Sequence, residues 1–431
     1  MLRGSASALF GNASGGVISI WTRPPAIERL HGEARFVAGS FGERSGRTWN
    51  KWQSTTSMRV GAGTAQMTIS RLDYEGERDH SAADQRVLNA RLRMPIADGW
   101  SLGVLMKELR QFYATGGQAL PELPVQYADY AAWQRERMQG EGFEREMDFW
   151  RAELKDAPDV LELTVAQGPR RGQNNRGATE RLSLSEQTTK EIKETSRREG
   201  VTLFMFLLTA FYVLLHYYSK REDIVVGVDV ANRNQSDTEG LIGLFVNQVV
   251  MRADLSGQPN FRELLARVSA MTLRVYAHQD FPFDKLVDSL KLERQLGRNP
   301  LFQVMFGLQN LPRLSKELPG LTLTSVRMET DTTIFDLSLY MAETDQKLVG
   351  WMRYSTDLFT FKTIERMIEH YEKIVQKVVT DPSVTLQALH DLLAADDQQL
   401  QLSRQTESRQ TMHKMLATVR PQPIKGVLSR T

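Results

Sequence analysis

The chain has 431 residues, a net charge of +2 and no cysteine, with 41% hydrophobic and 25% charged residues. This composition is typical of globular protein, and the length allows two or three domains of roughly 100–200 residues each. The lack of cysteine excludes disulfides, thiolate metal sites and cysteine nucleophiles and favours a reducing, cytoplasmic compartment. The sequence also shows no basic stripe, so it gives no reason to expect a nucleic-acid partner.

The first 96 residues combine glycine-rich turns with strand patterns. The turn Gly-Asn-Ala-Ser-Gly-Gly at 11–16 leads into alternation from Val17 to Trp21. Neither Lys-Ser/Thr nor a helix pattern follows this turn, so a phosphate-binding loop is not favoured. Further alternation covers residues 33–42, 55–60 and 65–72. The N-terminus lacks the apolar stretch of a signal peptide.

These patterns, together with residues 73–83 and 87–92, resemble the plug end and first barrel strands of TonB-dependent outer-membrane receptors. A membrane barrel must close, with about eight strands as its lower limit, and this stretch is too short to supply them. We therefore expect residues 1–96 to be an incomplete antiparallel β fragment, either a twisted sheet or poorly ordered hairpins, without transport function.

Helix and strand patterns then alternate, which indicates an α/β fold. Helices are predicted at 100–112, 125–134, 143–154, 185–199, 202–218, 261–278, 284–290 and 363–379. Strands are predicted at 179–184, 223–230, 241–255, 300–310, 321–329, 335–340 and 348–354. The apolar run at 203–218 contains Thr209 and His216 and is shorter than the ~20 residues of a spanning helix, so we expect a buried helix and no membrane partner. The polar segment after Leu402 is expected to be disordered or linker-like.

Four motifs lie between residues 231 and 306. They read Ala-Asn-Arg-Asn-Gln at 231–235, Ile-Gly-Leu-Phe-Val-Asn-Gln at 242–248, His-Gln-Asp-Phe-Pro-Phe-Asp at 278–284 and Arg-Asn-Pro-Leu-Phe-Gln-Val-Met-Phe at 298–306. In this order and spacing they resemble the C-terminal motifs of nonribosomal peptide synthetase condensation domains. The resemblance implies a chloramphenicol acetyltransferase-like lobe, α/β with a mixed sheet and flanking helices, at residues 166–400. It also implies a remnant of the N-terminal lobe at 97–165 and a polar tail at 401–431.

Only the end of the family's active-site motif, His-His-x-x-x-Asp-Gly, is present. Asp98 and Gly99 match its last two positions, whereas Arg93 and Met94 occupy the histidine positions. An imidazole beside the attacking amine can accept its proton near neutral pH, but arginine stays protonated and methionine does not titrate. The resemblance therefore implies a catalytically incomplete domain in which Asp98 has a structural role. The sequence Ala-Asp-Gly-Trp at 97–100 also fits a receptor hairpin turn.

Other motif residues are candidates for the substrate tunnel or for structural roles. Asp129 is expected to accept a hydrogen bond that joins the two lobes. Trp133 continues a stripe that begins at Tyr127 and Tyr130, and such a stripe favours packing over ligand contact. Asn247 lies in an apolar run, where it either faces the cleft or makes structural hydrogen bonds.

The last motifs supply three further candidates. His278 is expected to be structural, near a helix C-terminus, and not a replacement for the missing histidine. Asp280 follows it in the same motif. Arg298 is a candidate structural cation, or a cation beside the carrier phosphate.

The resemblance implies a truncated condensation domain of an antibiotic or siderophore synthetase, with carrier domains and adjacent synthetase modules as partners. It implies no cofactor, because the phosphopantetheine arms belong to the carrier-bound substrates, and no metal. The alternatives are a TonB-dependent siderophore receptor fragment, a chimera without selected function and, less favoured, another acyltransferase of the same two-lobed superfamily.

Overall fold

The computed structural model of the chain describes residues 30–40, 48–60, 63–74, 83–93, 98–114, 120, 122–158, 160–165, 176–290, 299–309, 317–318, 321–322, 332–344 and 346–418. The glycine-rich turn at 11–16, Met94, Arg298 and most of the strand expected at 321–329 lie outside these residues. The chain forms two compact units, divided at Leu102, and Ile242–Leu244 belongs to the first unit.

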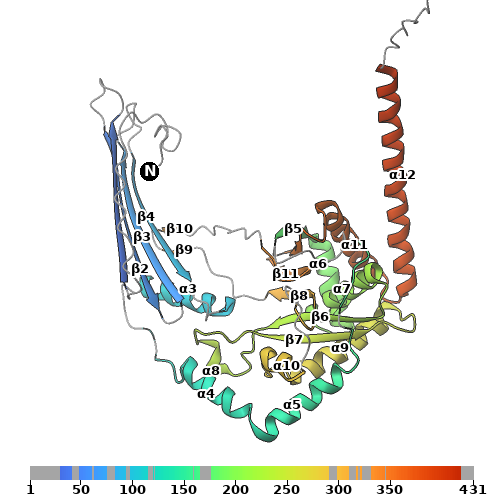
Figure 1. Ribbon diagram of the computed structural model, residues 1–431, viewed down its shortest axis with the longest axis horizontal. Helices are drawn as coiled ribbons and strands as arrows, with labels where there is room; N and C mark the ends of the chain where they lie inside the picture. The colour runs from blue at the N-terminus through green and yellow to red at the C-terminus, as the bar shows by residue number, and fades with distance from the viewer. Residues whose placement is uncertain are drawn as a thin grey trace, which may run out of the picture. The chain divides into compact units, whose positions relative to one another are not determined.

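The first unit contains a four-stranded antiparallel sheet in the order β1-β2-β3-β4 (Figure 1). Its strands are β1 (Leu30–Ser40), β2 (Thr48–Val60), β3 (Gly63–Tyr74) and β4 (Ala83–Arg93). Each strand pairs with the next one along the chain, as expected for strands joined by short turns. The antiparallel sheet expected from the alternating patterns is therefore present.

The second unit contains a six-stranded mixed sheet in the order β5-β12-β11-β8-β6-β7. β8 runs parallel to β6 and β11, and the other neighbours are antiparallel. The strands are β5 (Gly177–Ser183), β6 (Asp223–Val230), β7 (Asn247–Asp254), β8 (Val304–Gln309), β11 (Leu337–Glu343) and β12 (Leu348–Ser355). A separate short pair is formed by β9 (Glu317–Leu318) and β10 (Leu321–Thr322).

The described helices are α3 (Gly99–Ala114), which crosses from the first unit, α4 (Tyr127–Arg137), α5 (Gly140–Glu153), α6 (Glu186–Arg198), α7 (Leu203–Ser219), α8 (Ser236–Glu239), α9 (Phe261–Ala277), α10 (Phe283–Leu290), α11 (Phe361–Thr380) and α12 (Leu386–Thr418). Eight of the ten described helices lie where the sequence patterns predict them, whereas α8 and α12 were not predicted. Ser185 caps α6, as its hydroxyl accepts a hydrogen bond from the Thr188 N–H at 3.0 Å. Gly200 follows α6 with φ of +68°, a left-handed conformation that favours glycine.

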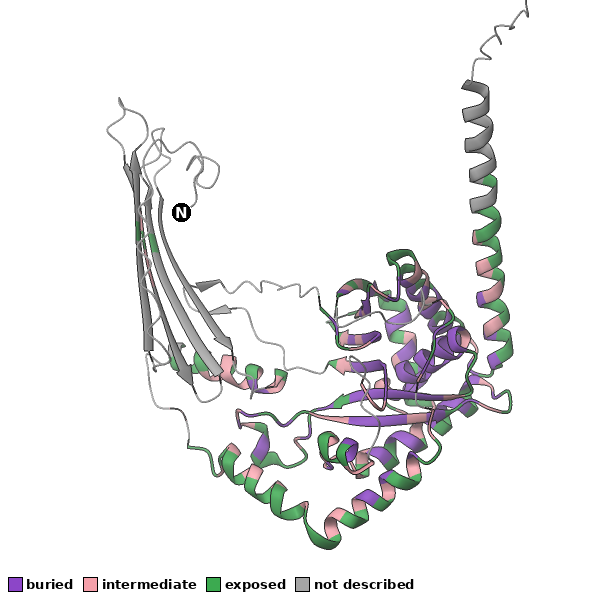
Figure 2. Cartoon of the chain, viewed as in Figure 1, coloured by how far each residue is buried: buried purple, intermediate pink, exposed green. Residues whose placement is uncertain are grey.

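The core of the second unit is built around α7. This helix is buried nearly all round, which explains why its sequence shows no polar face (Figure 2). α7 contacts α9 and α11, and the three helices lie against β7, β6, β8 and the β12 side of the sheet. Under the sheet, Phe302 packs so closely on β6 that a side chain at Gly227 would meet its ring at 2.1 Å. None of the described helices is by itself long and apolar enough to cross a membrane, and α6 and α7 pass that test only together, across a 106° bend.

Two expectations about element limits were wrong. The strand expected at 241–255 begins only at Asn247, because the backbone of Gly243 bonds the Ser101 side chain instead of a neighbouring strand. The tail expected to be disordered after Leu402 continues α12 as far as Thr418. That stretch contains Gln, Arg, Glu, Met and Lys, which are good helix formers, and no glycine or proline, so its polar residues do not oppose a helix.

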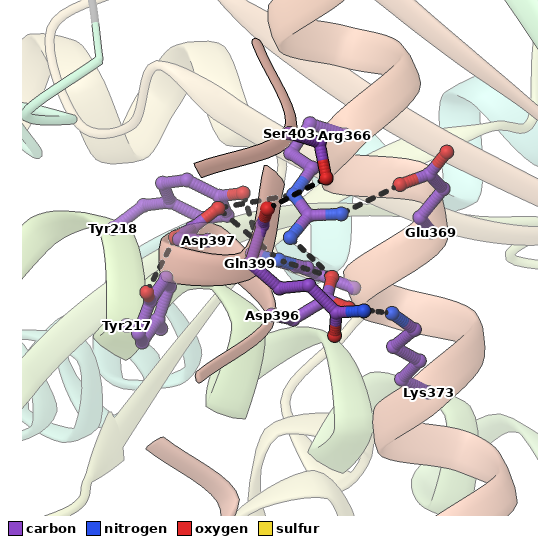
Figure 3. A network of polar contacts seen from close by, with 10 residues as sticks. Tyr217, Tyr218, Arg366, Glu369, Lys373, Asp396, Asp397, Gln399 and Ser403 are labelled. Atoms are coloured by element: carbon purple, nitrogen blue, oxygen red, sulfur yellow. Dashed lines mark hydrogen bonds and ion pairs between the residues drawn. The ribbon is translucent and has the colours of Figure 1, made fainter. Parts of the chain in front are cut away.

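A polar network holds the first half of α12 on α7 and α11 (Figure 3). Tyr217 donates to Asp397 at 2.6 Å, and Arg366 bonds Asp397 at 3.0 Å and pairs with Asp396. Tyr218 lies 2.8 Å from Nδ1 of His370. Burial lowers the pKa of His370 to about 4, although the carboxylates of Asp397 and Asp396 oppose this shift.

Two further histidines belong to this interface. Nδ1 of His216 lies 2.9 Å from Nε2 of His390, so one of the two neutral rings donates to the other. Burial, together with the neighbouring His216 and Lys220, lowers the pKa of His390 to about 4. Burial also lowers the pKa of His216.

Candidate functional site

The turn before α3 carries the remnant of the active-site motif. The carboxylate of Asp98 accepts hydrogen bonds from the Ser101 N–H at 2.8 Å and from the Ser101 hydroxyl at 2.7 Å. This is the geometry of a helix N-cap, in which an aspartate bonds a free N–H of the first turn. Gly99 is the first residue of the helix.

Ser101 is the residue at this turn that motif comparison did not single out. Its side chain is fully buried, and its Oγ lies 2.7 Å from the Gly243 carbonyl and accepts from the Gly243 N–H at 3.1 Å. A hydroxyl has one hydrogen, so Asp98 and the Gly243 carbonyl share it. Ser101 thereby ties the motif turn to the second motif at 242–248. The only signal in the sequence was a small polar residue at an otherwise apolar helix position.

Neither of the two histidine positions of the motif carries an imidazole side chain, because they are occupied by Arg93 and Met94. Arg93 ends β4, where it pairs with Thr64 of β3, and Met94 lies outside the described residues. Four histidine side chains are described, and each bonds a partner in the second unit: His216, His278, His370 and His390. The described residues contain no group of three or more His, Asp or Glu side chains placed to hold a metal ion.

Asn247 is the centre of a hydrogen-bonded loop. Its side-chain N–H groups donate to the carbonyls of Gln279 (2.8 Å) and Phe281 (2.7 Å), and its side-chain oxygen accepts from the Phe283 N–H (3.0 Å). One amide therefore satisfies three backbone groups of the loop that joins α9 to α10. Of the two roles considered for Asn247, this geometry is that of structural bonding.

The same loop carries His278 and Asp280. The ring of His278 stacks on Phe149 with 3.6 Å between centroids, and its Nδ1 lies 2.8 Å from the Glu146 carboxylate. Asp280 accepts from the side chain of Asn234 at 3.0 Å. Both residues therefore attach the loop to neighbouring segments: His278 to α5, and Asp280 to the turn after β6.

Trp133 joins this assembly through a cation. Arg137 lies over the Trp133 ring at 5.2 Å and pairs with Asp280 at 3.5 Å. The next aromatic of the stripe, Tyr130, packs on Phe245 with 4.5 Å between centroids, and burial raises the pKa of Tyr130 to about 12. The stripe is thus packing, with Trp133 at its half-exposed end.

Asp129 has a local partner. Its carboxylate accepts from the Gln126 N–H at 2.8 Å and forms a capping box at the start of α4, where we had expected a bond between lobes. The chain order Gln-Tyr-Ala-Asp places an acid at the third helical position, where it reaches back to the cap. The structure brings together four of the predicted site residues, Trp133, Asn247, His278 and Asp280. Asp98 and Asp129 instead cap two separate helices. Arg298 lies outside the described residues.

Comparison with known proteins identifies the family. The sequence profile of the Condensation domain matches residues 95–401. The chain belongs to the condensation-domain family. It is 41% identical over 336 residues to one of the linear gramicidin synthase proteins of Brevibacillus parabrevis, a match that covers 75% of this chain and 4% of that protein. The chain therefore spans a small fraction of that relative's length.

Solved structures share the fold of this condensation domain. The X-domain from teicoplanin biosynthesis is 25% identical with a TM-score of 0.64, over 71% of this chain and 72% of that one. A four-domain nonribosomal peptide synthetase bound to AMP and glycine is 23% identical with a TM-score of 0.62, over 70% and 24% of the two chains. The expected mixed α/β, chloramphenicol acetyltransferase-like fold is confirmed. The family match begins at residue 95, so the receptor resemblance of residues 1–96 rests on the sequence pattern alone.

Proposed function

We propose that residues 97–400 are the C-terminal two thirds of a peptide synthetase condensation domain that does not form amide bonds by itself. In the family reaction an amine attacks a thioester carbonyl, the C–N bond forms, the C–S bond breaks, and the proton lost by the amine ends on the departing thiolate, which leaves as a thiol. The observation that carries the proposal is the pair Arg93 and Met94 at the histidine positions. Neither side chain can accept that proton near neutral pH.

The packed core of the second unit supports a role without catalysis. A mixed sheet in contact with α7, α9, α10 and α11, with α5 against α10, can fold around its own core, so the lobe does not need a catalytic centre to stay folded. The proposed partners are carrier domains with phosphopantetheine-bound substrates and neighbouring synthetase modules. No cofactor of the chain itself is required in this proposal.

The test is amide synthesis by the purified chain. Two carrier domains, one loaded with an acylated donor and one with an aminoacyl acceptor, are incubated with the chain, and an intact condensation domain serves as the positive control. We expect no dipeptide above the rate without protein by mass spectrometry. Amide product made by this chain would overturn the proposal of inactivity.

We infer that residues 1–96 take no part in this function. The separate four-stranded sheet and a family match that begins at residue 95 support this inference. A receptor fragment and a chimera joined near residues 93–101 are the two interpretations of this stretch. Sequencing across codons 90–101 in the source genome separates them, because an uninterrupted reading frame there argues against a joined product.

A further inference from the structure

One carboxylate on the six-stranded sheet is held by neutral donors, whereas a second carboxylate on the same strand pairs with an arginine. Asp223 and Asp229 both lie on β6, with side chains on the same face of the sheet because their positions differ by six, an even number. Asp223 pairs with Arg252 at 2.7 Å. Asp229 instead accepts from the Gln248 amide at 3.1 Å and the Tyr340 hydroxyl at 3.3 Å. Within the described chain, no ion pair joins Asp229 to a cation.

The position of Tyr340 depends on a glycine. Gly307 of β8 is the cross-strand neighbour of Tyr340 on β11, and a side chain at Gly307 would meet the Tyr340 ring at 2.7 Å. The ring therefore lies across β8, and its hydroxyl reaches β6. On the other side, Trp351 of β12 is the antiparallel partner of Tyr340. A carboxylate, an amide, a phenol and an indole thus form one row across five strands.

This row suits an ammonium ligand. The Asp229 carboxylate accepts from two neutral donors and still has lone pairs that can accept from the N⁺–H groups of an ammonium. The Tyr340 hydroxyl donates its hydrogen to Asp229, so its oxygen can accept from the same ammonium. The faces of tyrosine and tryptophan attract cations when these lie within about 6 Å. Burial raises the pKa of the Asp229 carboxyl, the direction expected when no cation compensates the charge. The Asp229 side chain nevertheless remains accessible to solvent.

Asp229 also lies close to Asn247, the asparagine that bonds the loop between α9 and α10. Asp229 pairs with Gln248, and the adjacent pair in the ladder is Val230 with Asn247. A ligand on Asp229 would therefore sit at the end of β6 and β7 where the motif 242–248 meets the sheet. This places the carboxylate beside the family motifs, although it belongs to none of those singled out in the sequence.

We propose that Asp229, supported by Tyr340 and Gln248, binds the ammonium group of an amine ligand, which under the proposed function is the aminoacyl acceptor. This assignment rests on the proposed function for the identity of the ligand, but not for the chemistry of the site. No covalent step is assigned to these residues. Their role is to hold and orient the amine.

The test measures binding of two matched probes to the full chain. Alanyl-aminopantetheine, a stable amide analogue of an alanyl thioester, carries a free ammonium, and its N-acetyl derivative carries none. Titration calorimetry at pH 7 is expected to give tighter binding of the ammonium probe. Asp229→Asn, which keeps the shape of the side chain, should raise the dissociation constant of the ammonium probe by at least about tenfold, as loss of a charge-assisted hydrogen bond implies. The acetylated probe should be unaffected.

Two further variants complete the design. Tyr340→Phe keeps the ring over Gly307 and should give a smaller loss for the ammonium probe. Asp237→Asn removes an exposed carboxylate on α8 and should leave both probes as in the wild type. Equal affinity of the two probes for the wild type, or wild-type affinity of Asp229→Asn for the ammonium probe, would overturn the assignment. Because amide synthesis is not measured, these outcomes are separate from failure of the proposed function.

Discussion

At the scale of single residues, Asn247 has the clearest structural role. Its amide bonds three backbone groups of one loop, and its exchange for alanine would leave two carbonyls and one N–H without their partner. We predict that Asn247→Ala lowers the free energy of unfolding by about 1–3 kcal/mol, the usual cost of unsatisfied buried polar groups. Urea denaturation measured by circular dichroism checks this value.

Two companion variants show whether the donors matter. Asn247→Asp keeps the acceptor for the Phe283 N–H but faces two carbonyls with a carboxylate, so it should be no more stable than Asn247→Ala. Asn234→Ala removes an exposed amide that bonds Asp280 and should change stability by less than about 0.5 kcal/mol. A fully stable Asn247→Asp would show that the two donated bonds contribute nothing.

Motif comparison found the residue types of the site but not their partners. It placed Asp98 at the right turn and drew attention to Asn247, since a polar residue in an apolar run must be bonded. It could not find Ser101, whose partner Gly243 lies 142 residues away in the sequence. Asp129 was assigned a distant partner because the local capping geometry was not considered, although the spacing of Gln126 and Asp129 contained that signal.

At the scale of elements, α12 depends on histidines that are buried in neutral form. Charged groups face them from the C-cap of α7 (Lys220), from α11 (Arg366, Lys373) and from α12 itself (Asp391, Asp396, Asp397). Histidine has an ordinary pKa near 6.5, whereas His370 and His390 are held at about 4. Between these values the unfolded chain binds protons that the folded chain does not bind. Stability is therefore complete above about pH 6.5 and falls as the pH falls towards 4.

We predict that the free energy of unfolding is level from pH 7.5 to about 6.5 and decreases from there to pH 4.5, as measured by urea titrations at each pH. His390→Gln keeps a group that can bond His216 but does not titrate. The slope of the free energy of unfolding against pH should therefore be smaller, by an amount that corresponds to the uptake of up to one proton. Gln387→Ala, an exposed change on the same helix, should keep the wild-type slope. A stability that does not vary over this range would contradict the assignment of neutral buried histidines.

Element types were easier to predict than element limits. The buried run of α7 and the β-branched run of β6 have patterns that belong to one structure only, and both were predicted within one residue of their limits. The start of β7 depends on the bond between Ser101 and Gly243, which no local pattern encodes. The extent of α12 was missed because polarity was taken as a sign of disorder, whereas Gln, Arg and Glu are good helix formers.

At the scale of the whole molecule, the described residues form two large sheets of different kinds, one antiparallel with four strands and one mixed with six, besides the short β9–β10 pair. All residues of the described hydrophobic core lie between Met147 and Leu393, which is within the family match. The boundary at about residue 96 was predicted from two resemblances that meet there, and the compact units divide at Leu102. The position of the boundary stays a prediction, based on motifs that change abruptly there. The order of the strands in each sheet could not be predicted, since it depends on contacts between distant residues.

The four-stranded sheet also bears on whether catalysis could be restored. If only the missing side chains prevented amide formation, the double variant Arg93→His, Met94→His would restore it. We predict that it does not, because Arg93 is the last residue of β4, where it pairs with Thr64 of β3, and the family match begins only at residue 95. The double variant should fold with an unchanged circular dichroism spectrum and form no dipeptide from two loaded carriers by mass spectrometry. Product above the wild-type background would contradict this prediction and would show that two side chains suffice to give the chain amide-forming activity.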